Sequence, residues 1–144
     1  MQDLIIDYPN GNITLNVRGF FPVPQAQFKG IVKKIISRAE DRDDKVKDLT
    51  DEFREYIREN EEEAKGFAKR YVDNRTLAAE LKAEAGKMFH PNGSRITDEE
   101  FKEMKRRIRE YERRSKSALH SGNALLRKNE KLQKHIEILN EVRW

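Results

Sequence analysis

The sequence has no cysteine, and only 4 prolines and 7 glycines among its 144 residues. Without cysteine the chain has no disulfide bonds, thiolate metal sites or cysteine nucleophiles, which fits a reducing compartment. No apolar run approaches the roughly 20 residues that a membrane-spanning helix needs. The first residues, Met1-Gln2-Asp3, lack the basic and apolar stretches of a signal peptide. We therefore expect a cytoplasmic protein that does not enter the membrane.

Charge, in contrast, is abundant and unevenly distributed. Charged residues make up 39% of the chain and apolar residues 36%, with a net charge of +4. Residues 40–63 carry 12 acidic and 5 basic side chains, whereas residues 102–116 carry 8 basic and 3 acidic ones. This composition predicts helices with large solvated faces, within one folded unit of elongated form.

The N-terminal part reads as two strands followed by a helix. Apolar residues alternate over 4–8 and 13–17, which predicts a β-hairpin whose turn is Pro9-Asn10-Gly11-Asn12. Apolar residues from Phe28 to Ala39 then recur at helical spacing, which predicts an amphipathic helix that packs on the hairpin. We expect this ββα unit to occupy residues 1–40.

Residues 41–144 are predicted to form an elongated, coiled-coil-like helical region continuous with that unit. Three-four spacing of apolar residues predicts a helix over 44–72, capped by Asp43 or Asp44. Asp73-Asn74 is expected to separate it from a shorter helix over 76–89, which ends at the turn of residues 90–94.

The last helix has the clearest start in the chain. Thr97 and Glu100 form a capping box, and Ile96 and Phe101 occupy the positions of a hydrophobic staple. Heptad spacing then continues to Leu139, which favours one helix through Gly122 over two helices that meet there. The fold class is therefore mainly α with a small N-terminal β-hairpin, in which long antiparallel helices form a helical hairpin or coiled-coil arm.

The C-terminal part of this helix carries a helix-pairing seam, and its pairing partner is open. Packing against the helix of residues 44–72 is one interpretation. The other is a parallel homodimer over the part of the seam that the 44–72 helix is too short to cover, because asparagine at a buried heptad position pairs best with its counterpart in register. The helix of residues 76–89 is the competing cover for that part of the seam. The seam residues are Leu125, Asn129, Leu132, Ile136 and Leu139.

A cluster of cations near the start of the last helix, which we call the basic run, is the main candidate binding site. It could contact the phosphates of a nucleic acid or an acidic protein surface. Alternatively, it is a solvated face that is partly neutralised by Glu103, Glu110 and Glu112 and by the acidic helix of residues 44–72. The basic run consists of Lys102, Lys105, Arg106, Arg107, Arg109, Arg113, Arg114 and Lys116.

Two smaller groups of residues complete the candidates. Phe20 and Phe21, beside Arg18, are possible anchors for a partner, although core packing is the simpler role. The histidines, at positions 90, 120 and 135, have no metal-ligand spacing and are expected at the surface, so we predict no metal site. No phosphate loop, nucleophile elbow or zinc-binding helix motif is present, and we expect neither enzyme activity nor a cofactor.

These features favour a non-enzymatic interaction protein. A basic helix followed by leucine heptads is similar to the bZIP pattern, but Arg106 stands at the position where that family's asparagine would be sought. Small size, high charge and lack of catalytic motifs resemble the accessory and inhibitor proteins of phages and mobile elements, including inhibitors of CRISPR nucleases. That resemblance implies docking onto a nucleic acid, or onto a protein that handles one, as a regulator or inhibitor. The alternative is a structural coiled-coil scaffold with no nucleic-acid role.

Overall fold

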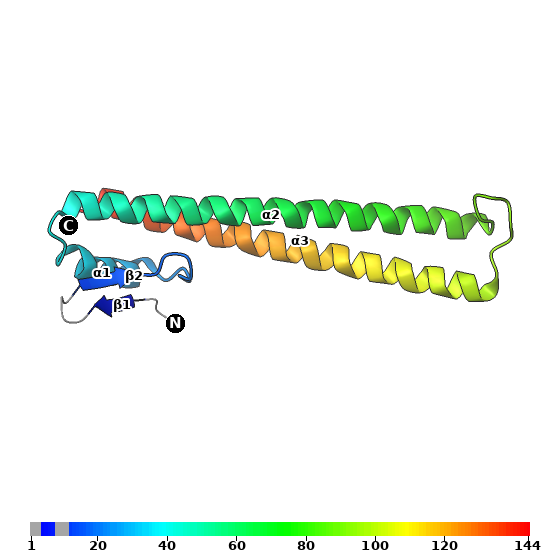
Figure 1. Ribbon diagram of the computed structural model, residues 1–144, viewed down its shortest axis with the longest axis horizontal. Coiled ribbons are helices and arrows are strands. Elements are labelled where there is room, and N and C mark those ends of the chain that lie inside the picture. Colours follow the sequence, from blue (N-terminus) through cyan, green and yellow to red (C-terminus); the bar gives the residue numbers. More distant parts are fainter. Residues whose placement is uncertain (1–3, 8–11) are drawn as a thin grey trace. The chain divides into compact units, whose positions relative to one another are not determined.

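The computed structural model describes residues 4–7 and 12–144, with side chains from residue 15 onward. The elements are β1 (Leu4–Asp7), β2 (Asn12–Leu15), α1 (Gln25–Ile36), α2 (Arg42–Lys87) and α3 (Asp98–Glu141). The fold is mainly helical, and the two long helices α2 and α3 pack against each other (Figure 1). Among the described residues, no helix combines the length and the apolar character that crossing a membrane requires.

The two N-terminal strands are short. β1 and β2 pair antiparallel, with Leu4 opposite Leu15 and Asp7 opposite Asn12, and β2 lies against α1. Most of the predicted turn, residues 9–11, falls outside the described residues. The complete hairpin therefore stays a prediction.

α2 is one helix of 46 residues, so the predicted break at Asp73-Asn74 is wrong. The Asn74 amide donates to the Arg70 carbonyl at 2.7 Å, and the Thr76 hydroxyl donates to the Val72 carbonyl at 2.9 Å. Side chains of this kind often cap helices, but here each bonds to the preceding turn of its own helix. The helices predicted on either side of the break are therefore continuous.

The starts of the two long helices are fixed by side-chain caps. The Asp41 carboxylate, and not Asp43 or Asp44 as predicted, caps α2 by accepting the Asp44 backbone N–H at 3.1 Å. At α3 the predicted capping box is confirmed. The Thr97 hydroxyl accepts the Glu100 backbone N–H at 3.2 Å and donates to the Glu100 carboxylate at 3.1 Å.

The near-equal lengths of α2 and α3 change the interpretation of the seam. α3 has 44 residues and runs through Gly122 without a break, as its heptad phase predicted. The expectation that a shorter partner helix leaves part of the seam uncovered rested on the break in α2. Because α2 has 46 residues, it is long enough to cover that part as well.

The chain divides into two compact units, which are described separately. Unit 1 comprises residues 1–62 and 125–144, and unit 2 comprises residues 63–124. The boundary predicted after residue 40 falls inside unit 1, because α1 shares its core with parts of α2 and α3.

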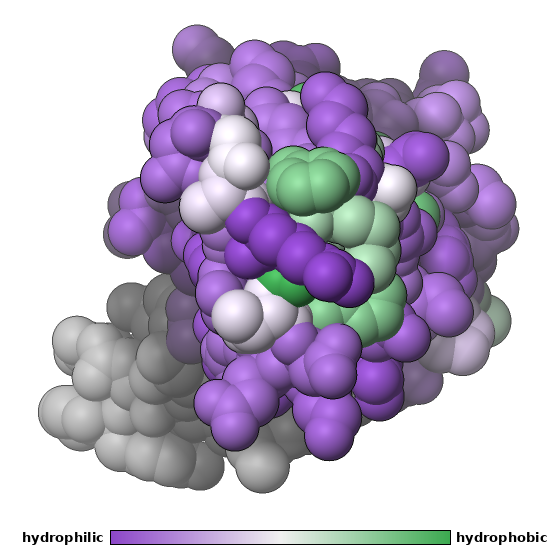
Figure 2. Space-filling view, turned by 90° about the vertical axis from the view of Figure 1, so that its right-hand side faces the viewer, coloured by the Kyte–Doolittle hydropathy of each residue, from purple (hydrophilic) through white to green (hydrophobic). Residues whose placement is uncertain are grey.

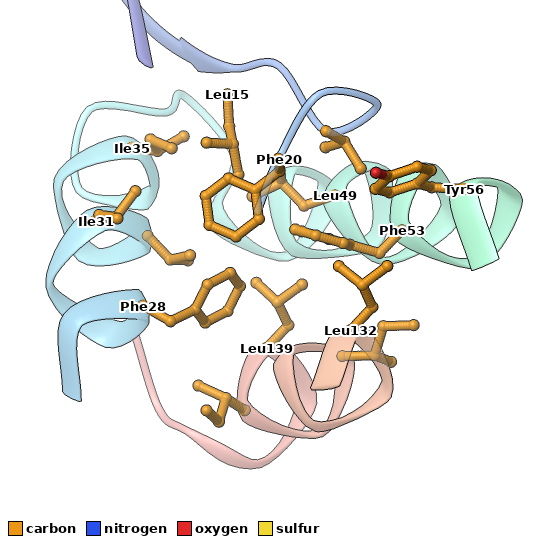
Figure 3. Packing of buried hydrophobic residues seen from close by; sticks show 14 of the residues in the cluster. Leu15, Phe20, Phe28, Ile31, Ile35, Leu49, Phe53, Tyr56, Leu132 and Leu139 are labelled. Carbon is orange, nitrogen blue, oxygen red and sulfur yellow. The ribbon is translucent and has the colours of Figure 1, made fainter. Parts of the chain in front are cut away.

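Unit 1 has a core rich in aromatic and aliphatic side chains (Figure 3). Phe20, Phe28 and Phe53 are almost fully buried and meet edge to face, with ring centroids 5.7–6.0 Å apart. Leu132 and Leu139 enter the same core from α3. Each fully buried side chain of this kind contributes roughly 1.5 to 3 kcal/mol, so this core is the main source of stability in unit 1.

Unit 2 has a smaller core, which lies next to the α2–α3 loop. Ala85, Ile96 and Met104 are buried there, and Leu81 and Phe101 pack against them. Ile96 and Phe101 thus belong to one cluster, as the predicted hydrophobic staple requires.

The rest of the interface in unit 2 is made largely of small residues. Ala78, Ser115 and Ala118 are buried along it. A Cβ atom added to Gly122 would lie 3.4 Å from the Phe67 Cβ, which is van der Waals contact. The two helices therefore approach closely at this point.

Candidate binding surface on α3

Five members of the basic run form a single line along α3, which we call the basic stripe. They follow one another at intervals of four, three, four and three residues, so they share one face of the helix. All five are exposed, and from first to last they span about 21 Å at 1.5 Å per residue. The basic stripe consists of Lys102, Arg106, Arg109, Arg113 and Lys116.

Two carboxylates of α3 itself pair with part of the basic run. Arg106 bonds Glu103, and Arg113 bonds Glu110, each with a shortest N–O distance of 2.6 Å. Glu110 also accepts Arg114 Nε at 3.1 Å. These bonds lower the pKa of both carboxyl groups. Because the pairs are exposed and screened by solvent, they contribute little to stability, so the arginines remain available to a stronger anion.

The other members of the basic run have no carboxylate partner within the described residues. Lys105 lies over the Phe101 ring at 4.6 Å, and Arg107 donates to the Tyr111 hydroxyl at 3.2 Å. No described carboxylate forms an ion pair with the stripe members at positions 102, 109 and 116. These three cations are the best placed to bind an external anion.

The predicted partial neutralisation of the basic run is confirmed for Glu103 and Glu110, whereas Glu112 pairs with Lys82 and the basic run faces the later part of α2, not the acidic helix. In unit 2 the partner of α3 is the later part of α2, as the Lys82–Glu112 ion pair shows. The acidic segment, residues 40–63, lies in unit 1 except for Glu63, and there α2 packs against the end of α3. The register is set by buried side chains, and exposed charges contribute too little to override it.

The net positive charge of the chain is consequently concentrated in unit 2. Unit 2 carries 15 Lys and Arg against 10 Asp and Glu, a net charge of +5. Unit 1 carries 15 Lys and Arg against 16 Asp and Glu, a net charge of −1. A polyanion is therefore attracted to unit 2 in preference to unit 1.

The helix-pairing seam is occupied within the chain. Leu132, Ile136 and Leu139 are buried in the core of unit 1, and Leu125 is half-buried. Asn129, on which the homodimer interpretation depended, bonds to Asn60 of α2 at 2.9 Å. The seam therefore gives no reason for a second copy of the chain, and a homodimer stays a prediction.

The three candidate anchors have different positions in unit 1. Phe20 is 1% exposed and belongs to the core, so it is not available to a partner. Phe21 is 63% exposed, with the Lys128 ammonium 5.0 Å from its ring centroid. Arg18 is exposed and pairs with Glu59 at 2.8 Å. Only Phe21 has the exposed aromatic surface that an anchor needs.

His135 was expected at the surface, but it is 2% exposed, so that prediction is wrong. Its ring stacks on Phe28, with centroids 4.0 Å apart and planes inclined by 2°. Nε2 accepts the Val23 backbone N–H at 3.2 Å, whereas Nδ1 has no partner among the described residues. Burial lowers the pKa of the imidazole to about 4, so His135 is a neutral core residue at pH 7.

His90 lies in the α2–α3 loop, as predicted, but it is bound on both sides. Nδ1 contacts Glu84 at 3.1 Å, and Nε2 contacts Glu100. These hydrogen bonds raise the pKa of His90 and lower that of Glu100. The imidazole therefore joins the end of α2 to the start of α3. Within residues 4–7 and 12–144, no group of three or more potential ligands is arranged to hold a metal ion.

The same loop carries exposed apolar side chains, although the sequence predicted that they lie in a helix. Met88 and Phe89 are 45% and 52% exposed, and Met88 has a positive φ of 62°. Figure 2 shows the face at this loop, where hydrophobic residues form a patch surrounded by hydrophilic ones. The nearby turn signal of Pro91 to Ser94 indicates the loop, but not that these side chains point outward.

Comparison with known protein families, curated proteins and solved structures finds no match to this chain.

Proposed function

We propose that this protein is a non-enzymatic interaction protein that docks onto a nucleic acid through unit 2. The basic stripe on α3 is the contact surface, and the phosphate backbone is its ligand. Bound in this way, the protein acts as a regulator or inhibitor, because it occupies nucleic acid that an enzyme would otherwise engage. An acidic groove on a protein that handles nucleic acid is the alternative partner.

The observation that carries this proposal is the concentration of positive charge in unit 2, on the exposed face of α3 that the basic stripe forms. The stripe spans about 21 Å, which matches about six phosphates along one strand at roughly 3.4 Å per phosphate. The acidic segment belongs to unit 1 except for Glu63, and unit 2 has a net charge of +5. A phosphate displaces an exposed carboxylate at little cost, since such pairs are screened by solvent and contribute little to stability.

The test is charge reversal at the three stripe positions that have no carboxylate partner. The variant Lys102→Glu, Arg109→Glu, Lys116→Glu leaves the pairs of Arg106 and Arg113 in place. Its matched control reverses three exposed cations of unit 1, in Lys34→Glu, Lys47→Glu, Arg54→Glu. Both variants change the net charge equally, so a difference in their binding shows that the position of the reversed charges matters.

Binding is measured by fluorescence anisotropy with labelled single-stranded DNA, duplex DNA and duplex RNA over a range of salt concentrations. We expect the stripe variant to bind at least one of them more weakly than the control does. Its salt slope should also fall by about one unit for each phosphate that the variant no longer neutralises. If the stripe variant and the control bind all three with equal affinity and slope, the basic stripe is not the contact surface. If the wild type binds none, the nucleic-acid role is wrong.

A further inference from the structure

Unit 1 contains a pocket of about 410 Å³ that is unrelated to the basic stripe. Its apolar lining comes from Ile36 of α1 together with Val142 and Trp144, which follow α3. Ile36 is 1% exposed, and the other two are half-buried against the core of unit 1. The volume lies within the range of roughly 300 to 1,000 Å³ that is typical of small-molecule sites.

The segment that forms one wall of this pocket is held in place by two hydrogen bonds. The Trp144 indole N–H donates to the Leu139 carbonyl at 3.0 Å. The Arg42 guanidinium donates to the Trp144 carbonyl at 3.0 Å. The wall is therefore formed before any ligand arrives, which reduces the entropy that a ligand must lose on binding.

The charged residues in the lining are all cations. Lys29 and Lys33 come from α1, Arg42 from the start of α2, and Arg143 from the segment after α3. No side-chain carboxylate is among the lining residues, and the main-chain oxygen of Trp144 in the lining is already the acceptor of Arg42. The cations therefore favour a ligand with an anionic group. The apolar lining favours a ligand that also has an apolar part.

A wider neighbouring cavity of about 970 Å³ shares five lining residues with this pocket, namely Ser37, Arg42, Val142, Arg143 and Trp144. Its lining includes the carboxylates of Glu40, Asp41 and Asp43. These carboxylates disfavour a second anion, so the smaller pocket is the one suited to it.

A glycine inside α1 also belongs to this lining. Gly30 lies in the middle of a 12-residue helix, where glycine costs roughly 0.5 to 1 kcal/mol relative to alanine. Apart from its chain neighbours and the adjacent backbone of α1, no atom lies within 4 Å of the position that a Cβ atom would occupy, so packing does not require the glycine. Because Gly30 lines the pocket, any side chain there would narrow it.

We propose that this pocket binds a small amphipathic anion, namely a carboxylate carried by an aliphatic chain. The chain lies against Ile36, Val142 and Trp144, and the carboxylate is bound by the surrounding lysine and arginine side chains. This inference is independent of the proposed nucleic-acid role, because no residue of unit 2 takes part.

The test uses octanoate as the probe and Trp144 as the reporter. Trp144 is the only tryptophan of the chain, so its fluorescence reports the pocket directly. Octanol has the same apolar body without the charge, and acetate has the charge without the body. We expect saturable binding of octanoate, both in Trp144 fluorescence and in calorimetry, with affinity at least about tenfold above octanol and acetate. Equal affinity for octanoate and octanol, or no saturable octanoate binding, would overturn the proposal.

Two glycine variants show whether the ligand occupies the pocket. Gly30→Leu places a side chain in it, whereas Gly66→Leu places the same side chain at a helical glycine outside it that also has open space. We expect octanoate binding to be lost in the first variant and retained in the second, with unchanged circular dichroism in both. Retained binding in a folded Gly30→Leu variant would place the ligand elsewhere and contradict the proposal. Lys29→Gln with Lys33→Gln should weaken octanoate about tenfold and leave octanol unchanged.

Discussion

The side chains of Asn60 and Asn129 bind each other across the interface of α2 and α3 in unit 1. The Asn60 amide donates to the Asn129 Oδ1 at 2.9 Å, and the Asn129 amide donates to the Ile57 carbonyl at 3.1 Å. Asn60 and Asn129 are 6% and 7% exposed. A buried amide is costly without a partner, so this pair favours one register of the two helices over its neighbours.

Replacing one asparagine of this pair should destabilise the protein more than replacing both. Asn60→Leu leaves the Asn129 oxygen buried without this donor, which costs about 1 to 3 kcal/mol. In the double variant Asn60→Leu, Asn129→Leu, two apolar side chains face each other, so part of that loss should be recovered. The free energies of unfolding are measured in urea.

The matched control for these variants is Asn123→Leu at an exposed asparagine of α3, for which we expect a change within about 0.5 kcal/mol. If the effects of the two single substitutions simply add in the double variant, the two amides do not interact and the register argument fails.

The elements of this fold could be predicted better than their pairing. Local signals such as the capping box at Thr97 and the heptad phase through Gly122 depend on neighbours in the sequence, and both were predicted correctly. The sequence also shows polar residues at Asn60 and Asn129 within otherwise apolar stripes. The sequence does not show that the two side chains meet, because their contact depends on the register of α2 against α3. In addition, the break wrongly predicted at Asp73-Asn74 made the partner helix seem too short.

For the candidate site, too, the local pattern could be predicted from the sequence but the pairing of the helices could not. The basic run is visible in the sequence, but which segment of α2 faces it depends on the register of the two helices. Overall charge complementarity suggested the correct partner helix but the wrong register, since exposed ion pairs are weak compared with buried packing. The burial of His135 was missed for a related reason. A histidine beside the seam is indistinguishable from a surface histidine until Phe28 and Val23 are known to cover it.

The close approach of α2 and α3 at Gly122 predicts a sharp dependence on side-chain size. Gly122→Ala places a methyl group 3.4 Å from the Phe67 Cβ, which the interface accommodates. Because alanine has a higher helix propensity than glycine, this variant should be more stable than the wild type by up to about 1 kcal/mol. Gly122→Leu should force the helices apart and cost about 1 to 3 kcal/mol.

The control for these two variants is the same pair of substitutions at Gly66, where no atom lies within 4 Å of an added Cβ. Both Gly66 variants should be at least as stable as the wild type in urea unfolding. A Gly122→Leu variant as stable as Gly66→Leu would show that the helices are not in close contact there.

The buried His135 predicts a loss of stability in mild acid. The pKa of His135 is lowered to about 4 in the folded protein, whereas an unfolded histidine has a pKa of about 6.5. Between these values the unfolded chain binds the additional proton, so stability falls as the pH decreases from about 6.5 to about 4. The full effect is on the order of 3 kcal/mol.

The comparison is between the wild type and His135→Gln, with urea unfolding measured at several pH values across this range. The stability of the variant should depend less steeply on pH, because the remaining carboxylates and histidines are common to both proteins. Parallel pH profiles for the two proteins would mean that His135 is not buried in its neutral form.

His90, in the α2–α3 loop, predicts the opposite dependence of stability on pH. Hydrogen bonds to Glu84 and then to Glu100 raise the pKa of His90 above its ordinary value of about 6.5. The folded protein therefore holds this proton more tightly than the unfolded chain does. The resulting stability is fully present below the unfolded pKa and is lost as the pH rises through the folded pKa.

Titration of the His90 ring protons by NMR should give a pKa above about 6.5. Glu84→Gln or Glu100→Gln should lower the pKa of His90, because each variant removes one of the two carboxylates that favour the protonated ring. Glu80→Gln removes an exposed carboxylate of α2 that makes no bond to His90, so it should leave this pKa unchanged. A His90 pKa that is equal in the wild type and in both glutamine variants would show that the imidazole does not bind these carboxylates.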